Sequence, residues 1–111
     1  MTSPKYVLKK ATDGQHMFNL LAANSETILT SERYTSKAGA ENGISSVKTN
    51  SPRDDRYDRK KSSDNQHYFV LKAANGEPIG RSERYTTAGA MEIGIASVKK
   101  NGPIATVDDQ T

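Results

Sequence analysis

The pentapeptide Ser31-Glu32-Arg33-Tyr34-Thr35 occurs a second time as Ser82-Glu83-Arg84-Tyr85-Thr86, 51 residues further along the chain. The same offset aligns residues 13–52 with residues 64–103 without a gap, and 23 of these 40 aligned pairs are identical. A unit of about 50 residues buries little surface by itself, so two copies that share one core are the economical arrangement. The question of the fold therefore becomes how two copies of one small unit combine.

The composition excludes several classes of protein. The 111 residues include no cysteine, which excludes disulfides, thiolate metal sites and cysteine nucleophiles. Residues 1–10 contain no apolar run of signal-peptide length, and no stretch approaches the roughly 20 apolar residues of a membrane span. The net charge of +3 permits anionic partners without requiring them. These properties predict a soluble, cytoplasmic, single-domain protein.

Period-two alternation predicts three strands in each unit. His16, Phe18, Leu20 and Ala22 alternate along the second strand, and the same four residue types recur 51 residues later. Polar turns containing Asp-Gly, Asp-Asn or Asn-Gly separate the strands, as hairpins require. The expected strands are Tyr6–Lys10, 16–22 and Thr27–Arg33 in the first unit, and Tyr57–Lys61, 67–73 and Pro78–Arg84 in the second.

A helix follows the third strand of each unit. It is expected to begin after Thr35-Ser36 and Thr86-Thr87, which are good N-cap residues, and to end at Asn50 and Asn101-Gly102. Its apolar stripe has the spacing i, i+3, i+4 and i+7, at Ala40, Gly43, Ile44 and Val47 and at Met91, Gly94, Ile95 and Val98. A glycine at the same stripe position in both copies predicts a close approach of helix to sheet.

Each unit therefore has the predicted order β-β-β-α-β. The last strands are expected at Arg53–Arg56 and Ile104–Val107, and residues 108–111 are expected to fray. The junction 53–61 is short and lacks glycine, so the chain is predicted to cross from one unit to the other as a strand. We expect an α+β fold with one mainly antiparallel sheet, both helices on one face, and the other face open to solvent. The two repeats, about 5–56 and 57–107, are predicted to interlock as one domain over 1–111.

The chain resembles the YegP family, small bacterial proteins with one or two copies of a domain of unknown function. The resemblance rests on Phe69-Val70-Leu71-Lys72-Ala73-Ala74-Asn75-Gly76, on Ser31-Glu32-Arg33-Tyr34-Thr35-Ser36-Lys37 and on Gly94-Ile95-Ala96-Ser97-Val98-Lys99, and it covers nearly the whole chain. It implies β3-α-β units related by a pseudo-two-fold axis in one sheet, with exchanged C-terminal strands. It also implies that single-copy relatives form homodimers, whereas this chain is its own dimer. The family offers no catalytic residues to transfer.

Two constellations could carry chemistry, and both have a simpler explanation. His16 and His67 are equivalent and could form a symmetric proton-transfer or metal-binding pair, but each is better explained as a histidine at the edge of the core. On an extended strand, Glu32 and Tyr34 would point one way and Ser31 and Arg33 the other. That split argues against a nucleophile beside its base, so a strand end with a packed tyrosine is favoured over a ligand-binding patch.

The strongest charge feature is a basic segment that contains Arg53, Arg56, Arg59, Lys60 and Lys61. It encloses Tyr57 and is diluted by three aspartates. Basic groups and aromatics on a sheet can bind single-stranded nucleic acid, and Tyr68 and Lys72 on the open face would suit that role. A solvated strand whose charges discourage edge aggregation is the structural alternative, and we favour it.

The sequence alone does not establish a function. We expect a small, non-catalytic binding or accessory module, monomeric, without cofactor or metal, that contacts another macromolecule. The alternative is weak single-stranded nucleic-acid binding through the basic central strands. The residues expected to contact a protein or nucleic-acid partner are Arg56, Arg59, Lys61, Tyr68 and Lys72.

Overall fold

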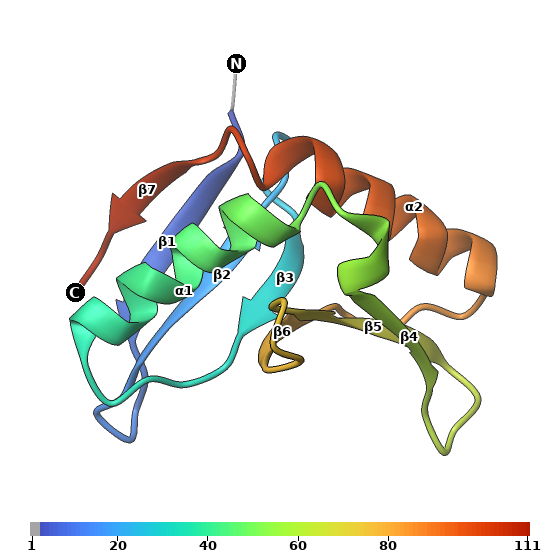
Figure 1. Cartoon of the computed structure of the whole chain (residues 1–111), viewed down its shortest axis with the longest axis horizontal. Coiled ribbons are helices and arrows are strands. Elements are labelled where there is room, and N and C mark those ends of the chain that lie inside the picture. Colours follow the sequence, from blue (N-terminus) through green and yellow to red (C-terminus); the bar gives the residue numbers. More distant parts are fainter. Residues whose placement is uncertain (1–2) are drawn as a thin grey trace.

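A computed structural model of the chain describes residues 3–111 (Figure 1). Residues 1 and 2 lie outside the described residues. They are the first residues of the N-terminal segment for which no signal peptide is predicted. The elements are β1 (Lys5–Lys10), β2 (His16–Leu21), β3 (Thr27–Ser31), α1 (Lys37–Asn50), a 3₁₀ turn η1 (Asp54–Arg56), β4 (Tyr57–Lys61), β5 (His67–Lys72), β6 (Pro78–Arg81), α2 (Ala88–Asn101) and β7 (Thr106–Asp109).

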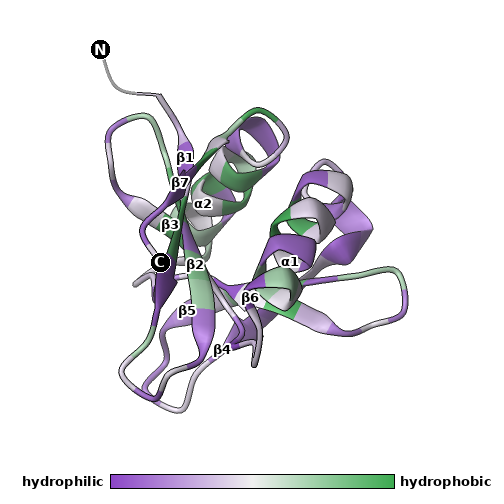
Figure 2. Ribbon diagram, turned by 90° about the vertical axis from the view of Figure 1, so that its left-hand side faces the viewer, coloured by the Kyte–Doolittle hydropathy of each residue, from purple (hydrophilic) through white to green (hydrophobic). Residues whose placement is uncertain are grey.

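The seven strands form one sheet in the order β4-β5-β6-β3-β2-β1-β7. All neighbouring pairs are antiparallel except β1 and β7, which run parallel. Both helices lie on the same side of the sheet (Figures 1 and 2). The predicted α+β architecture, with a mainly antiparallel sheet and two helices on one face, is confirmed.

The two repeats meet at a pseudo-two-fold axis. At the centre of the sheet, β3 pairs with β6 so that Thr30 lies opposite Arg81, and these two residues are equivalent under the 51-residue offset. On the helix side, Ser51 and Gly102 form a second equivalent pair in contact, since a Cβ on Gly102 would overlap the Ser51 side chain. Equivalent residues can touch each other only near the axis that relates them.

The C-terminal strand crosses between repeats, as predicted, but it spans Thr106–Asp109 and not the expected Ile104–Val107. β7 belongs to the second repeat and pairs with β1 of the first, with Lys5 opposite Thr106 and Leu8 opposite Asp109. The expectation that residues 108–111 fray is wrong for their first part: the strand includes Asp109, and the amide of Gln110 donates to the carbonyl of Leu8 at 2.8 Å. The end of the chain does not fray as far as expected, because the edge of β1 provides hydrogen-bond partners for its backbone.

The equivalent segment of the first repeat behaves differently. The predicted strand Arg53–Arg56 is wrong, because Asp54–Arg56 forms the 3₁₀ turn η1. The amide of Arg56 donates to the carbonyl of Arg53 at 3.1 Å. This tight turn redirects the chain from the end of α1 into β4 without a flexible linker.

The third strand of each repeat is also shorter than predicted, ending at Ser31 and Arg81. The Ser31 hydroxyl accepts a hydrogen bond from the amide of Phe18 at 2.9 Å and donates to the carbonyl of Glu32 at 2.7 Å, and Ser82 makes the same two bonds in the second repeat. A side-chain oxygen thus takes the place of a backbone acceptor, and the regular strand ends there.

The helices follow their sequence signals. The Ser36 and Thr87 hydroxyls cap the two N-termini by accepting from the third residue beyond them, and all eight predicted stripe residues are buried. A Cβ at Gly43 would lie 2.5 Å from the hydroxyl oxygen of Tyr34, and one at Gly94 would lie 2.5 Å from that of Tyr85. The predicted close approach is therefore confirmed, and the tyrosine of each repeated pentapeptide is what fills the space beneath the helix.

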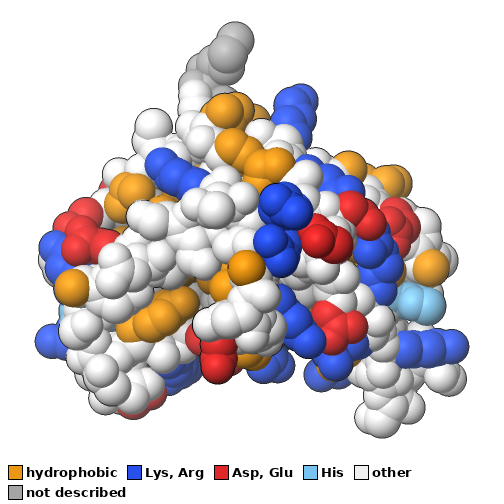
Figure 3. All heavy atoms as spheres, viewed as in Figure 1, with side chains coloured by type: hydrophobic (Ala, Val, Ile, Leu, Met, Phe, Trp, Pro, Cys, Tyr) orange, Lys and Arg blue, Asp and Glu red, His pale blue; other side chains and the backbone are white. Residues whose placement is uncertain are grey.

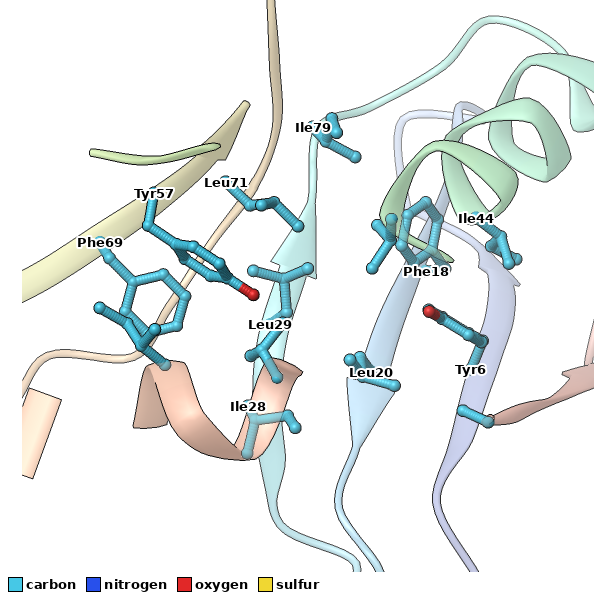
Figure 4. Packing of buried hydrophobic residues seen from close by; sticks show 14 of the residues in the cluster. Tyr6, Phe18, Leu20, Ile28, Leu29, Ile44, Tyr57, Phe69, Leu71 and Ile79 are labelled. Carbon is cyan, nitrogen blue, oxygen red and sulfur yellow. The ribbon is translucent and has the colours of Figure 1, made fainter. Parts of the chain in front are cut away.

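A single cluster of buried apolar side chains spans both repeats (Figure 4). Two fully or nearly buried tyrosines link the layers: the Tyr6 hydroxyl donates to the carbonyl of Gly102 at 2.6 Å, and the Tyr57 hydroxyl donates to that of Ser51 at 2.7 Å. Burial raises the pKa of both phenols above the usual range. Because Tyr6 belongs to the first repeat and Gly102 to the second, this contact ties the repeats together.

Candidate macromolecule-binding face

The side of the sheet that faces away from α1 and α2 is called the open face here. Residues of a strand alternate between the two sides, and the buried residues Tyr6, Phe18 and Phe69 mark the helix side. The strand pairing then places on the open face Lys5, Val7, Lys9, Met17, Asn19, Leu21, Thr30, Asp58, Lys60, Tyr68, Val70, Lys72, Arg81 and Asp108.

Apolar side chains on the open face form two groups, and all of them are partly exposed. Val7, Met17 and Leu21 come from β1 and β2, and Tyr68 and Val70 come from β5. The polar strip Asn19, Thr30 and Arg81 lies between the two groups, and the Asn19 amide donates to the Thr30 hydroxyl at 2.9 Å. The surface is therefore neither a bare hydrophobic patch nor a uniformly charged one.

The two halves of the open face differ although the core beneath them is duplicated. Met17 is equivalent to Tyr68, and Leu21 is equivalent to Lys72. On the helix side the equivalent residues Phe18 and Phe69 are identical. The two copies thus share their packing surface and present different chemistry to solvent.

The structure does not bring the five predicted contact residues to one surface. Tyr68 and Lys72 lie on the open face, as expected. Arg59 pairs with the buried Phe69 and so points to the helix side, which Lys61 shares by its even spacing from Arg59. Arg56 lies in η1 at the outer edge of the sheet. Strand alternation therefore divides the five residues between the two sides of the sheet and its outer edge.

The Arg59 side chain is held in a charge network on the helix side. Its guanidinium donates to both carboxylate oxygens of Glu92, at 2.6 and 3.0 Å, and to Asp54 at 2.9 Å. Asp54 also accepts from Lys99 at 2.7 Å. The hydrogen bonds from Lys99 and then Arg59 lower the pKa of Asp54 to about 2. A cation engaged by two carboxylates is poorly placed to bind a phosphate.

The cations around Tyr68 are partly neutralised as well. Asp58 forms ion pairs with Lys72 at 3.0 Å and with Lys60 at 3.3 Å, and the hydrogen bonds from Lys72 and then Lys60 lower the pKa of Asp58. Figure 3 shows the same mixing on the helix side, where blue and red side chains lie next to one another over the half that holds α2 and β4. Basic and acidic groups are thus interspersed on both faces.

The backbones of the two candidate histidines take part in the sheet. His16 and His67 each form a backbone bridge, to Tyr34 and Tyr85 respectively. They lie on β2 and β5, which are separated by β3 and β6, so the two imidazoles do not meet at the axis.

Within residues 3–111 no group of three or more His, Cys, Asp or Glu side chains could hold a metal ion. No helix among these residues is long and apolar enough to cross a membrane.

The five predicted contact residues include none from the first repeat or from β6, although both contribute to the open face. Lys5, Lys9 and Met17 lie there beside Leu21, and Arg81 lies at the centre, within 4.0 Å of Glu32. The alternation of β1 and β2 carried this information, because residues at odd spacing from the core positions point away from the helices.

Comparison with known proteins places this chain in a family. The model of the family described as "Domain of unknown function (DUF1508)" matches residues 11–58 and again residues 62–109. The chain is 56% identical over 106 residues to the UPF0339 protein YegP of Shigella flexneri and 57% identical over 106 residues to a UPF0339 protein of Bordetella pertussis, with 96% of each chain covered in both cases.

Two solution NMR structures have the same fold. YegP from E. coli, described as a protein of unknown function, superposes with a TM-score of 0.94 at 52% identity, covering 100% of this chain and 96% of that one. A UPF0339 protein of Shewanella oneidensis has a TM-score of 0.90 at 48% identity, covering 96% and 91%. Two family-model matches, relatives above 50% identity over nearly the full length, and the shared fold together show that the chain belongs to the DUF1508 family, as a two-repeat member similar to YegP.

Proposed function

We propose that this chain is a small, non-catalytic binding module that contacts a protein partner through the open face of its sheet. The observation that carries the proposal is the uncovered face itself, on which Tyr68, Val70 and Met17 stand partly exposed among ion-paired lysines. Interfaces of this kind combine aromatic and methionine anchors with a polar rim. The different chemistry of the two halves suits a partner without two-fold symmetry.

Single-stranded nucleic acid is the second candidate, and one observation supports it. Tyr68 lies opposite Lys60 and four residues from Lys72 on the same face, which is an arrangement for stacking a base beside phosphate-binding cations. It ranks second because Asp58 engages both lysines. A protein partner supplies mixed charges that can exchange with these ion pairs, whereas a phosphate would meet the aspartate.

The test compares an open-face variant with a matched control on the helix side. Met17→Lys combined with Tyr68→Lys removes the anchor of each half, and Ile93→Lys changes an apolar residue of α2 that is 73% exposed. Wild-type protein and the Ile93→Lys variant are expected to capture the same discrete protein from native extract, and the double variant is expected to lose it. Capture of nothing above background, or equal loss with both variants, contradicts the proposal.

A parallel titration with a mixed-sequence single-stranded oligonucleotide separates the two candidates. Amide shifts at Lys60, Tyr68 and Lys72 that weaken steeply with salt would favour nucleic acid, because phosphate contacts release counterions. The protein-binding proposal predicts no saturable shifts in this titration.

A further inference from the structure

The strands β1 and β4 are equivalent in the two repeats, but only β1 is covered by a further strand. β1 and β4 occupy equivalent positions under the 51-residue offset, with Lys5 matching Arg56 and Tyr6 matching Tyr57. β7 lies against the outer edge of β1, whereas the order of strands ends at β4 (Figure 1). The cause is chain continuity: the segment equivalent to β7 is 55–58, and it enters β4 itself instead of lying beside it.

From this asymmetry we infer that the free edge of β4 is a docking site for an extended acidic segment of a partner protein, which adds as a parallel strand beside Arg56–Arg59. Addition of a strand to an exposed edge is a general mode of peptide recognition. The site differs from the open face, because it uses the backbone of the sheet edge, and it goes beyond the function proposed above.

β7 shows what such a segment looks like. Its sequence is Thr106-Val107-Asp108-Asp109, and it pairs with β1 over four residues. Asp108 forms an ion pair with Lys5 at 3.6 Å, and Asp109 forms one with Lys37 of α1. An acidic strand on a basic edge is therefore already part of this fold.

Arg56 occupies the position on the β4 edge that Lys5 holds on the β1 edge, and it lacks the corresponding partner. Its Nε atom is buried without a hydrogen-bond partner, and its guanidinium forms no ion pair within residues 3–111. It lines a hollow of about 340 Å³ together with Asp55, Tyr57, Asp58 and Lys72. A carboxylate at the position of Asp108 in a docked strand would meet this guanidinium.

The charge of the β4 edge determines which kind of segment can dock there. Asp58 engages Lys60 on β4, whereas Arg56 and Lys61, which lie beside and on β4, have no ion-pair partner in the part of the chain that the structure describes. Two such basic edges repel each other, so pairing of β4 with β4 of a second copy is disfavoured. An acidic strand gains from the same charges.

The experiment uses the intact labelled protein and a synthetic peptide with the sequence of residues 103–111 of this chain as a surrogate for the partner segment. A second peptide carries asparagine in place of both aspartates. The acidic peptide is expected to shift the amides of 55–60 saturably and more weakly at high salt, with contacts between peptide and β4 amides that identify a parallel strand. The neutral peptide is expected to bind less tightly.

The pseudo-symmetry provides a matched pair of variants. Arg56→Gln is expected to weaken peptide binding roughly fivefold, the upper value for an exposed ion pair. Lys5→Gln removes the equivalent cation from the covered edge and is expected to leave peptide binding unchanged, and dispersed amide spectra verify that both variants fold. The inference is overturned by the absence of shifts at 55–60, by shifts confined to 5–10 that reveal displacement of β7, or by equal binding of the neutral peptide. It is equally overturned if an oligonucleotide, and not the peptide, moves the β4 amides.

Discussion

The contact between each helix glycine and the tyrosine of the repeated pentapeptide gives a quantitative prediction. Gly43→Ala places a Cβ 2.5 Å from the Tyr34 hydroxyl oxygen, 2.8 Å from its Cζ and 3.0 Å from an edge carbon of Phe18. Overpacking of this kind costs about 1–3 kcal/mol, and three short contacts to two rigid rings place it at the upper end. Replacing glycine by alanine within a helix stabilises that helix by about 1 kcal/mol. We expect a net loss of about 2 kcal/mol of unfolding free energy.

The assay is urea unfolding at neutral pH, followed by circular dichroism, with two comparisons. Gly89→Ala is the matched control, because a Cβ there meets nothing within 4 Å, and it is expected to be neutral or stabilising by up to about 1 kcal/mol. Tyr34→Phe added to Gly43→Ala removes the nearest of the three contacts and is expected to restore part of the loss. If Gly43→Ala is as stable as wild type, or if the double variant is no better than the single one, the reasoning from the close approach is refuted.

Three further predictions concern the core, the acid stability and the interlocking of the repeats. Tyr57→Phe should cost about 1–2 kcal/mol by leaving the buried Ser51 carbonyl without its donor, whereas Tyr68→Phe on the open face should change stability by less than about 0.5 kcal/mol, both measured by urea unfolding. The pKa of Asp54 is lowered to about 2, so the native state binds fewer protons at this carboxyl than the unfolded state does. The contribution of Asp54 to the free energy of unfolding is therefore complete above about pH 4 and is lost as the pH falls toward 2. Asp54→Asn should flatten this part of an acid titration followed by circular dichroism. A fragment of residues 1–56 should be unfolded or self-associated as measured by circular dichroism and sedimentation, because it lacks the second-repeat groups that complete its core; a stably folded monomeric fragment would contradict interlocking.

Local signals in the sequence were sufficient to predict most of the architecture. The caps at Ser36 and Thr87, the glycine stripe positions and the alternation of β2 and β5 each depend on residues a few positions apart. The turns also behave as their residues indicate, since Asn65 and Gly76 have positive φ values of 65° and 85°. Features with a short sequence span can be recognised from one sequence.

The candidate site could not be predicted to the same degree, because its charges are arranged by tertiary structure. Arg59 meets Glu92 33 residues away, and Lys99 meets Asp54 45 residues away. A basic run in the sequence therefore resembles a binding surface although several of its members are engaged. The early end of β3 has a similar origin, since it depends on a serine hydroxyl that reaches the backbone of another strand.

Contact between the open face and a protein partner can be tested by site-specific photo-crosslinking in cells. A photoreactive phenylalanine derivative is placed at Tyr68 on the open face or at Ile93 on α2, which is the more exposed of the two positions. The probe at position 68 is expected to yield a discrete protein adduct that the probe at position 93 does not yield. Adducts from position 93 alone, or the absence of any adduct from position 68, would contradict contact through the open face.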